Sequence, residues 1–222
     1  NDIVRENHLT TLMITHNMKQ ALATGSRTIM MDSGSIILSL EGKVRKEMTM
    51  DGLMKLYTEK KKEEFDKLIE LGETVWTYVC CGPEGHWLNR FLDFALIKGR
   101  LLFWGCAKNR ISGFLHWGLN QFQNGMNPYE GTSCPNHTGI GTNFPCGDSF
   151  LVYPGEDGPN LGMRLEAQRR GAEDAALWQL LREKDEKLHD ELIGKMFTNN
   201  YTYNDDPARF QEVYEELLAA LE

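Results

Sequence analysis

The sequence predicts an α/β fold in two parts, and three observations support this expectation. Strand-like and helix-like segments alternate along the chain, which is typical of parallel strands joined by crossover helices. Residues 1–57 carry 7 basic and 6 acidic side chains, whereas residues 58–222 carry 17 and 26, so the net charge changes from +1 to −9. The charged helical segment 58–73 lies where the composition changes, and we take it as the junction between domains 1–57 and 74–222.

The sequence of residues 1–57 predicts a small α/β unit. Apolar, β-prone residues alternate with helix-forming segments, and Asp32-Ser33-Gly34-Ser35 has the composition of a hairpin turn. Thr49 is a suitable N-cap for a second helix. The expected order is strand, helix, hairpin and helix, at residues 9–15, 17–24, 27–31 with 36–40, and from Thr49 onward.

The sequence of residues 74–222 predicts three strands and several helices. The strands are expected at 75–81, 111–117 and 149–155, and the helices at 89–104, 163–181, 184–196 and 207–221. In the helix 163–181 we expect Leu165, Ala172, Ala176 and Leu180 to share the buried face. The order strand, helix, strand predicts parallel pairing with right-handed crossovers, so that functional side chains gather beyond the carboxyl ends of the strands.

Composition excludes several classes of function. The net charge of −8 argues against a nucleic-acid surface. No run approaches the ~18 apolar residues of a membrane span. Five cysteines do not form a complete disulfide framework, so we expect reduced thiols, which favours a cytoplasmic location. Because the chain begins at Asn1, we expect that its true start is missing, and the compartment stays open.

We expect neither a metal nor another cofactor. Cys134-x-x-His137 with Cys146 has part of a zinc spacing, but a fourth ligand at regular spacing is absent from the sequence.

The strand ends carry side chains suited to a sugar site. Apolar sugar faces stack on aromatic rings, and hydroxyl groups bond to amides and carboxylates. The candidates are Trp117, His116, Asn120 and Tyr78, with Asn89, Asp148 and Glu166 as further polar groups. Aromatic residues near strand ends also form cores, as we expect for Trp76, and Asn120 could bond only its own backbone.

The N-terminal stretch LTTLMITHNMKQALATGSRTIMMDSGSII resembles the last part of an ABC-transporter ATP-binding subunit over residues 1–57. The resemblance implies that His16, at the end of MITH, corresponds to the histidine on the γ-phosphate side of ATP. The phosphate-binding loop G-x-x-x-x-G-K-[ST] is absent from the sequence, and its backbone amides and lysine hold the phosphates. We therefore expect His16 to be inactive here.

Residues of about 65–185 resemble the carboxyl-terminal part of the glycoside hydrolase family 123 catalytic domain. The motifs are W-x-Y, N-R-F-x-D, G-F-L-H-W-G-x-N, G-D-x-F-x-x-Y-P-G and R-L-E-A-x-R-x-G-x-E-D. The resemblance implies the last strands of a (β/α) barrel. It also implies exo-β-N-acetylgalactosaminidase activity, in which an Asp assists the substrate's acetamido group and a Glu is the general acid.

The resemblance implies that Trp117, His116, Asn120 and Tyr78 line the sugar pocket. It places the catalytic Asp-Glu pair upstream of this chain, and Glu173-Asp174 lies on a helix after the last strand, so we do not transfer the role to it. We therefore expect a fusion of two fragments, a partial barrel preceded by a small α/β fragment, that is inactive alone and self-associates through sheet edges. The alternatives are a non-catalytic carbohydrate-binding module and an ATP-binding transporter component.

Overall fold

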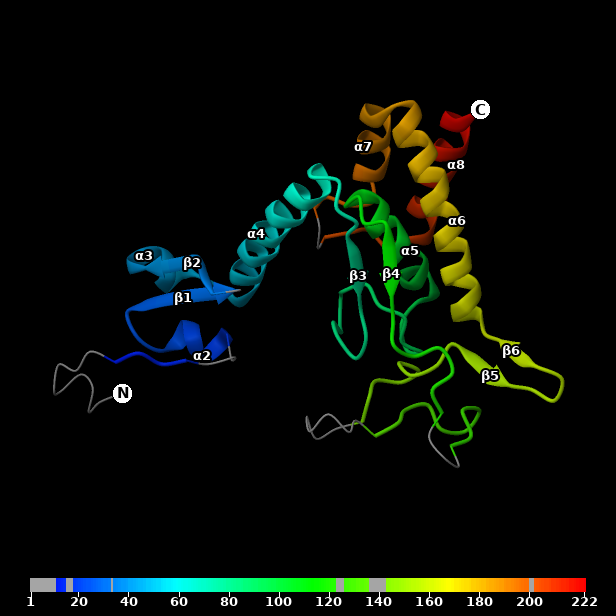
Figure 1. The fold of residues 1–222 in the computed structure, drawn as a ribbon, viewed down its shortest axis with the longest axis horizontal. Helices are drawn as coiled ribbons and strands as arrows, with labels where there is room; N and C mark the ends of the chain where they lie inside the picture. The colour runs from blue at the N-terminus through cyan, green and yellow to red at the C-terminus, as the bar shows by residue number, and fades with distance from the viewer. Residues whose placement is uncertain (1–10, 15–17, 33, 123–125, 136–142, 200–201) are drawn as a thin grey trace. The chain divides into compact units, whose positions relative to one another are not determined.

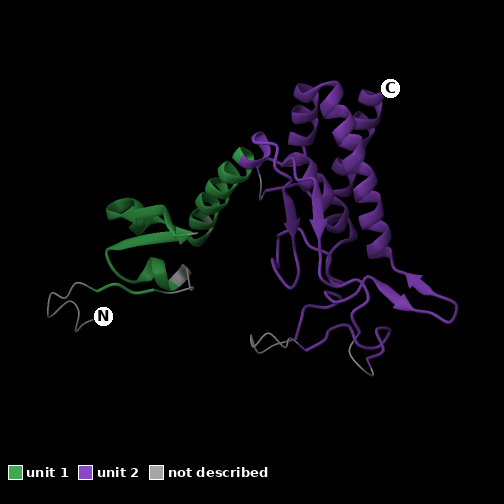
Figure 2. Ribbon diagram, in the orientation of Figure 1, with its two compact units in different colours: residues 1–67 green, residues 68–222 purple. Residues whose placement is uncertain are grey.

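The computed structural model describes residues 11–14, 18–32, 34–122, 126–135, 143–199 and 202–222 (Figure 1). The chain divides into two compact units, residues 1–67 and 68–222 (Figure 2). The division falls within helix α4 (Met50–Glu70), inside the charged segment 58–73. In the part of the chain that is described, no helix has the length and apolar character needed to span a membrane.

Unit 1 is built around a β-hairpin. Strands β1 (Arg27–Asp32) and β2 (Ser35–Glu41) pair antiparallel, as the turn composition predicts, and follow helix α2 (Met18–Ala23). Helix α3 (Gly42–Glu47) comes next, and then α4. The predicted N-cap of α4 is confirmed, because the Gly52 N–H donates to Thr49 Oγ1 at 3.0 Å.

The strand expected at residues 9–15 is not formed where the chain is described. Residues 11–14 lie outside any strand, and Leu12 and Ile14 are exposed. A strand needs a hydrogen-bonding neighbour, and in the described part of unit 1 β1 and β2 pair with each other alone. The apolar, β-prone composition of this stretch therefore misled the sequence interpretation.

A buried arginine joins the elements of unit 1. Arg45, on α3, donates from its Nε to Thr28 Oγ1 at 2.9 Å. Its terminal nitrogen Nη2 donates to the carbonyl oxygens of Leu22 at 2.9 Å and Thr24 at 2.6 Å. These carbonyls belong to the last turn of α2 and the residue after it, where the helix leaves acceptors without partners. Arg45 thus holds α2 against the hairpin.

Unit 2 contains one parallel strand pair, as the sequence predicts. Strand β3 (Trp76–Tyr78) pairs with β4 (Gly113–Leu115), and helix α5 (Leu96–Lys108) connects them. Helix α5 begins seven residues later than the expected residue 89. Residues 89–95 form a loop instead, whose main chain bonds to a distant segment: the Leu92 N–H donates to the Cys146 carbonyl at 2.9 Å.

The third expected strand does not extend this parallel sheet. Strand β5 (Val152–Pro154) pairs antiparallel with β6 (Pro159–Leu161) in a separate hairpin. The described residues thus form three two-stranded sheets, and the expectation that all three C-terminal strands pair in parallel is wrong. A single strand pattern gives the position of a strand but not its partner.

Helix α6 (Met163–Lys184) forms where expected, but its buried face differs from the prediction. Leu180 is 53% exposed, and Ala172 and Ala176 are also exposed. The buried residues are instead Arg164, Gln168, Gly171, Asp174, Trp178 and Leu181. Polar side chains occupy half of this face, so the hydrophobic pattern could not identify it.

The apolar core of unit 2 lies among helices α5, α6, α7 (Glu186–Gly194) and α8 (Pro207–Leu221), which Figure 1 shows packed together. The rings of Trp104 and Trp178 meet edge to face at 5.0 Å between centroids. Asp174 is buried beside them and accepts from Trp104 Nε1 at 2.7 Å and from Arg100 Nε at 2.6 Å. This paired carboxylate therefore joins α6 to α5.

Helices α5 and α6 approach closely at Gly171. A Cβ at this position would lie 2.8 Å from the Arg100 carbonyl oxygen and 2.7 Å from Phe103 Cδ2. Such distances are shorter than van der Waals contact, so only glycine fits without a shift of the backbone.

Candidate functional site

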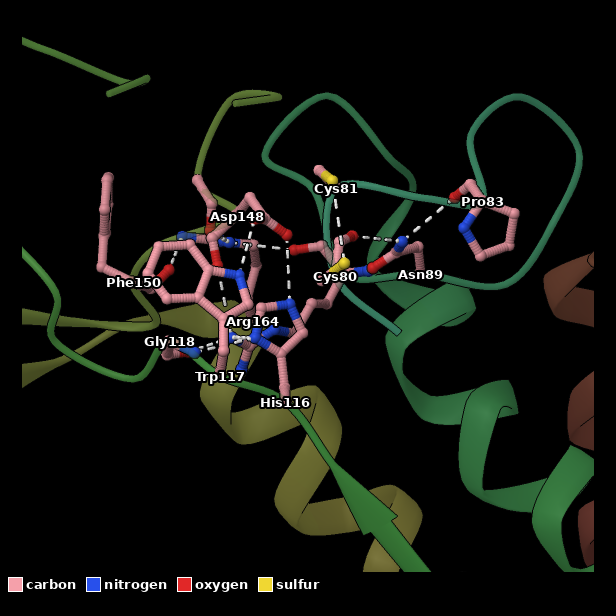
Figure 3. Close-up of polar contacts among 12 residues, drawn as sticks. Cys80, Cys81, Pro83, Asn89, His116, Trp117, Gly118, Asp148, Phe150 and Arg164 are labelled. Atoms are coloured by element: carbon pink, nitrogen blue, oxygen red, sulfur yellow. Dashed lines mark hydrogen bonds and ion pairs between the residues drawn. The ribbon is translucent and has the colours of Figure 1, made fainter. Parts of the chain in front are cut away.

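Five side chains meet beyond the ends of β3 and β4, and we call this group the strand-end network: Arg90, His116, Trp117, Asp148 and Arg164. They come from the loop before α5, the segment after β4, the loop before β5 and the first turn of α6. Figure 3 shows their contacts from close by. Side chains from several loops therefore meet beyond the carboxyl ends of the parallel strands, where the sequence predicts functional side chains.

Asp148 is the centre of the network. Its side chain is fully buried, and its two carboxylate oxygens have separate donors (Figure 3). His116 Nε2 lies 3.1 Å from Oδ1, and Trp117 Nε1 donates to Oδ2 at 2.9 Å. Both rings after β4 are thus oriented by one carboxylate.

His116 is fixed in one tautomer. Its Nδ1 accepts from the Gly118 N–H at 3.1 Å and from an Arg90 guanidinium nitrogen, so the ring proton belongs on Nε2, facing Asp148. The side chain is only 2% exposed. Burial lowers the pKa of His116, and the nearby Arg90 charge lowers it further although Asp148 opposes this. The ring is therefore neutral near pH 7 and has both nitrogens engaged.

Two buried arginines support the loops around Asp148. Arg164 donates to the carbonyl oxygens of Arg90 at 2.9 Å, Gly147 at 2.8 Å and Phe150 at 2.7 Å. Arg90 donates to the Gly118 carbonyl as well as to His116. Burial lowers the pKa of Arg90 to about 10, and the Arg164 charge contributes, so Arg90 stays charged at neutral pH. Burial also lowers the pKa of Arg164.

The aromatic candidates lie partly exposed at the edge of this network. Trp117 is 37% exposed although its Nε1–H is bound to Asp148, so one ring is held in place while part of its surface faces solvent. Tyr78 is 50% exposed, and its ring centroid lies 6.3 Å from that of His116. The centroid of Trp117 lies at the same 6.3 Å on a nearly parallel plane. Tyr78 and Trp117 are thus both aromatic neighbours of the buried His116 ring.

Trp76 is exposed, so the expectation that it belongs to the core is wrong. Its indole lies over Gly113 of the paired strand, where a Cβ would approach Trp76 Cδ2 to 2.4 Å. The missing side chain of Gly113 leaves room for the ring on an open sheet face, which the sequence of one strand alone did not reveal.

The remaining candidates have different positions. Asn120 is exposed and pairs through its main chain with Phe150 in an isolated antiparallel bridge. Asn89 donates from Nδ2 to the carbonyls of Cys80 and Pro83, and Glu166 pairs with Arg169 and Arg170 on the surface of α6. His16 and His137 lie outside the described residues.

Sequence reasoning missed the roles of Arg90 and Arg164. Both belong to the motifs that carry the resemblance, N-R-F-x-D and R-L-E-A, so their motif membership was the available signal. Arginine in a helix or a loop is usually a surface residue, and burial that depends on main-chain carbonyls from two distant loops has no local pattern.

The comparison with protein families now decides the assignment. Residues 35–181 match the family described as glycoside hydrolase 123, catalytic domain. The chain belongs to this family. The match starts before the range of about 65–185 expected from the motifs and includes part of the segment compared with ABC subunits.

Two individual relatives are similar to parts of the chain. A solved structure of a family 123 glycoside hydrolase from Clostridium perfringens, studied for glycolipid glycan hydrolysis, is 21% identical, with a TM-score of 0.48 over 72% of this chain and 28% of that chain. The tyrosine transport ATP-binding protein of Clostridioides difficile (strain R20291) is 40% identical over 55 residues, 25% of this chain and 22% of that protein. The chain thus spans about a quarter of the length of each.

Proposed function

We propose that this glycoside hydrolase 123 family member binds a terminal N-acetylgalactosamine at the strand-end network. The observation that supports this best is the held but partly exposed ring of Trp117. A ring fixed by Asp148 loses little conformational freedom when a sugar stacks on it, so its surface is prepared for binding. Tyr78, the other aromatic neighbour of His116, supplies a second, half-exposed aromatic surface. Asn120 is the exposed amide that the family resemblance implies for the site.

The same network does not supply a free acid or base. Asp148 has a donor on each oxygen, and His116 has a partner on each ring nitrogen. A glycosidase needs one carboxyl group that can donate a proton and a second group that assists at the anomeric carbon. We therefore propose that the chain alone does not hydrolyse glycosides and that the catalytic Asp-Glu pair belongs to an upstream segment.

Titration of the 222-residue chain with N-acetylgalactosamine, followed by the NMR signals of the indole N–H groups, tests the binding. The Trp117 signal is expected to shift. The substitution Trp117→Ala should weaken binding about tenfold, because loss of one stacking ring costs ~1 kcal/mol or slightly more. Trp117→Phe, which retains a ring, should retain most of the affinity.

Leu180→Ala, at an exposed position of α6, is the matched control and should bind like the unchanged chain. Equal affinity of the Trp117→Ala variant and the control would contradict the proposed stacking site. Hydrolysis of a chromogenic β-N-acetylgalactosaminide should stay at background. Turnover that Asp148→Asn abolishes would show that the acids are within this chain, and sugar binding without turnover fits both the incomplete enzyme and a binding module.

The transport relative supports a second candidate, an ATP-binding component. It covers a quarter of this chain, and the phosphate-binding loop is missing from the sequence. We expect no measurable affinity for ATP in a titration with a fluorescent analogue. Micromolar binding would favour this candidate over the glycan site.

Self-association is a further expectation for this chain. The two-stranded sheet β3–β4 exposes Trp76 and Leu115, and each strand has an outer edge. Sedimentation velocity over a range of concentrations should show an increasing fraction of dimers or larger species. A single monomeric species throughout would contradict the expectation.

A further inference from the structure

Two adjacent cysteines follow strand β3 and lie beside the strand-end network. Cys80 Sγ and Cys81 Sγ are 3.7 Å apart (Figure 3). Neighbouring side chains on an extended segment usually point to opposite faces, so this proximity requires a local change in backbone direction. The chain supplies that change where it turns after β3.

The main chain around the pair is held by hydrogen bonds. The Cys80 N–H donates to the Gly82 carbonyl at 3.1 Å, which closes a short loop. Asn89 Nδ2 donates to the carbonyls of Cys80 at 2.9 Å and Pro83 at 3.0 Å. Asn89 is itself fully buried. The two thiols therefore face each other because a buried amide fixes the loop that carries them.

The pair is also more accessible than two of the other cysteines. Cys80 and Cys81 are partly exposed, whereas Cys106 and Cys134 are buried. Cys146 is partly exposed, and its sulfur accepts a hydrogen bond from Thr132 Oγ1. No disulfide joins the five cysteines, all of which the structure describes, and the sulfurs of Cys80 and Cys81 are in direct contact.

We propose that Cys80 and Cys81 form a reversible oxidation site that a low-molecular-weight disulfide converts into an intrachain disulfide. One thiolate attacks the oxidant, forms a mixed disulfide and releases one thiol. The second thiolate then attacks the cysteine sulfur of the mixed disulfide, forms the Cys80–Cys81 bond and displaces the small molecule as the second thiol. The protein loses two protons and two electrons, and the oxidant becomes two thiols.

Such a bond is expected to be labile. Adjacent Cα atoms are about 3.8 Å apart across a trans peptide, which is below the usual range of ~4.4–6.8 Å for disulfides. Strained disulfides are easily reduced, and they are the regulatory ones. Burial and the neighbouring Cys80 raise the pKa of Cys81 to about 11, so closure is expected to become faster as the pH rises from 7 to 9.

Closure would act on the segment that joins the pair to the network. Asn89, which holds the Cys80 carbonyl, is followed by Arg90, and Arg90 contacts His116 and the Gly118 carbonyl. Cys80 also lies beside Tyr78, whose pKa is raised by burial and by this cysteine. The oxidation site does not depend on the proposed sugar binding, because it requires the two thiols and the held loop alone.

Peptide mapping of the full 222-residue chain tests the proposal. The reduced chain is incubated with glutathione disulfide, quenched in acid, alkylated and digested. The peptide with Cys80 and Cys81 should lose two hydrogen atoms in mass and escape alkylation, whereas Cys106 and Cys134 should be alkylated. Two alkylated thiols, or stable glutathione on either, would overturn the proposal.

Two variants and a second probe separate the pair from other thiols. Cys81→Ser should stop at the mixed disulfide on Cys80, whereas Cys146→Ser should react like the unchanged chain. Phenylarsine oxide, which bridges two thiols and releases water, should add one phenylarsenic group to the same peptide and none to Cys81→Ser. Incubation in urea should yield mostly mixed disulfides, since the held loop is lost. Equal closure in urea would contradict the role of that loop.

Discussion

Arg45 in unit 1 and Arg164 in unit 2 are both buried arginines whose guanidinium groups donate to main-chain carbonyl oxygens. Their surroundings differ. Arg45 binds carbonyls of the last turn of a single helix, α2, and of the residue after it. Arg164 binds carbonyls from two separate loops, one before α5 and one before β5, and shares its site with Arg90 and Asp148.

This difference shows what a buried charge can organise. A helix end already gathers its carbonyls in one place, so Arg45 adds stability to a structure that forms locally. Nothing local gathers the carbonyls of Arg90, Gly147 and Phe150, so Arg164 is what brings these loops together. Removing the two arginines should therefore have unequal effects on stability.

The substitution Arg164→Met should lower the free energy of unfolding of unit 2 by about 3–5 kcal/mol, because three buried carbonyls lose a charged donor. All five tryptophans lie at positions 76–178, so tryptophan fluorescence during urea unfolding reports on unit 2. Arg170→Met, an exposed arginine on the same helix, is the control and should change this energy by less than about 0.5 kcal/mol. Equal effects of the two would refute the organising role.

The substitution Asp148→Asn should lower the free energy of unfolding of unit 2 by about 2–3 kcal/mol. The carboxylate accepts from two N–H groups, whereas an amide has one oxygen and must direct its NH₂ group at either His116 or Trp117. Asp190→Asn is the control, because this exposed carboxylate also pairs with a histidine, His189. Urea unfolding should show little change for the control, and a similar loss in both variants would argue against the buried network.

The substitution Arg45→Met should destabilise unit 1 by about 1–2 kcal/mol, because carbonyls at a helix end can bond to water instead. Hydrogen exchange of peptides covering residues 18–32 should become roughly tenfold faster. Arg27→Met, which removes an exposed bond to Ser39, should leave exchange almost unchanged. If Arg45→Met lowered the free energy of unfolding as much as Arg164→Met does, the proposed difference between the two units would be contradicted.

The pH dependence of unit 2 should show the smallest effect. Burial lowers the folded-state pKa values of His116 and His189 below the unfolded value of about 6.5, so the unfolded chain binds more protons below that pH. Stability is therefore complete above pH 6.5 and falls as the pH decreases toward the folded pKa values, by at most ~1.4 kcal/mol per pH unit for each histidine. NMR titration should show that the His116 ring is still neutral at pH 6.5. Protonation of the His116 ring above pH 6.5 would mean a raised folded-state pKa, and the stability would then decrease, rather than increase, with rising pH.

The sequence identified elements better than their contacts. The hairpin β1–β2, the cap at Thr49 and the positions of β3 and β4 follow from local turn chemistry and β-branched or aromatic composition. The partner of β5 did not follow, because pairing depends on residues far away in the chain. For α6, hydrophobicity marked the wrong face, since the buried one carries Arg164, Gln168 and Asp174.

The candidate site could be located but not explained from the sequence. Strand ends and family motifs indicated Trp117, His116, Tyr78 and Asp148. In the structure His116 and Trp117 contact Asp148, and Tyr78 lies beside His116. The tautomer of His116 could not be predicted, because it depends on donors from Arg90 and Gly118. Local patterns carry no information about such donors until the fold places them.

Gly171 determines how α5 and α6 can slide along each other. A displacement by one helical turn, about 5.4 Å, would bring Ala167 or Ala175 to the point where Gly171 meets the Arg100 carbonyl. Either methyl group would collide with main-chain atoms that cannot rotate away. The two helices therefore have one permitted register, and a single hydrogen atom in place of a methyl group specifies it.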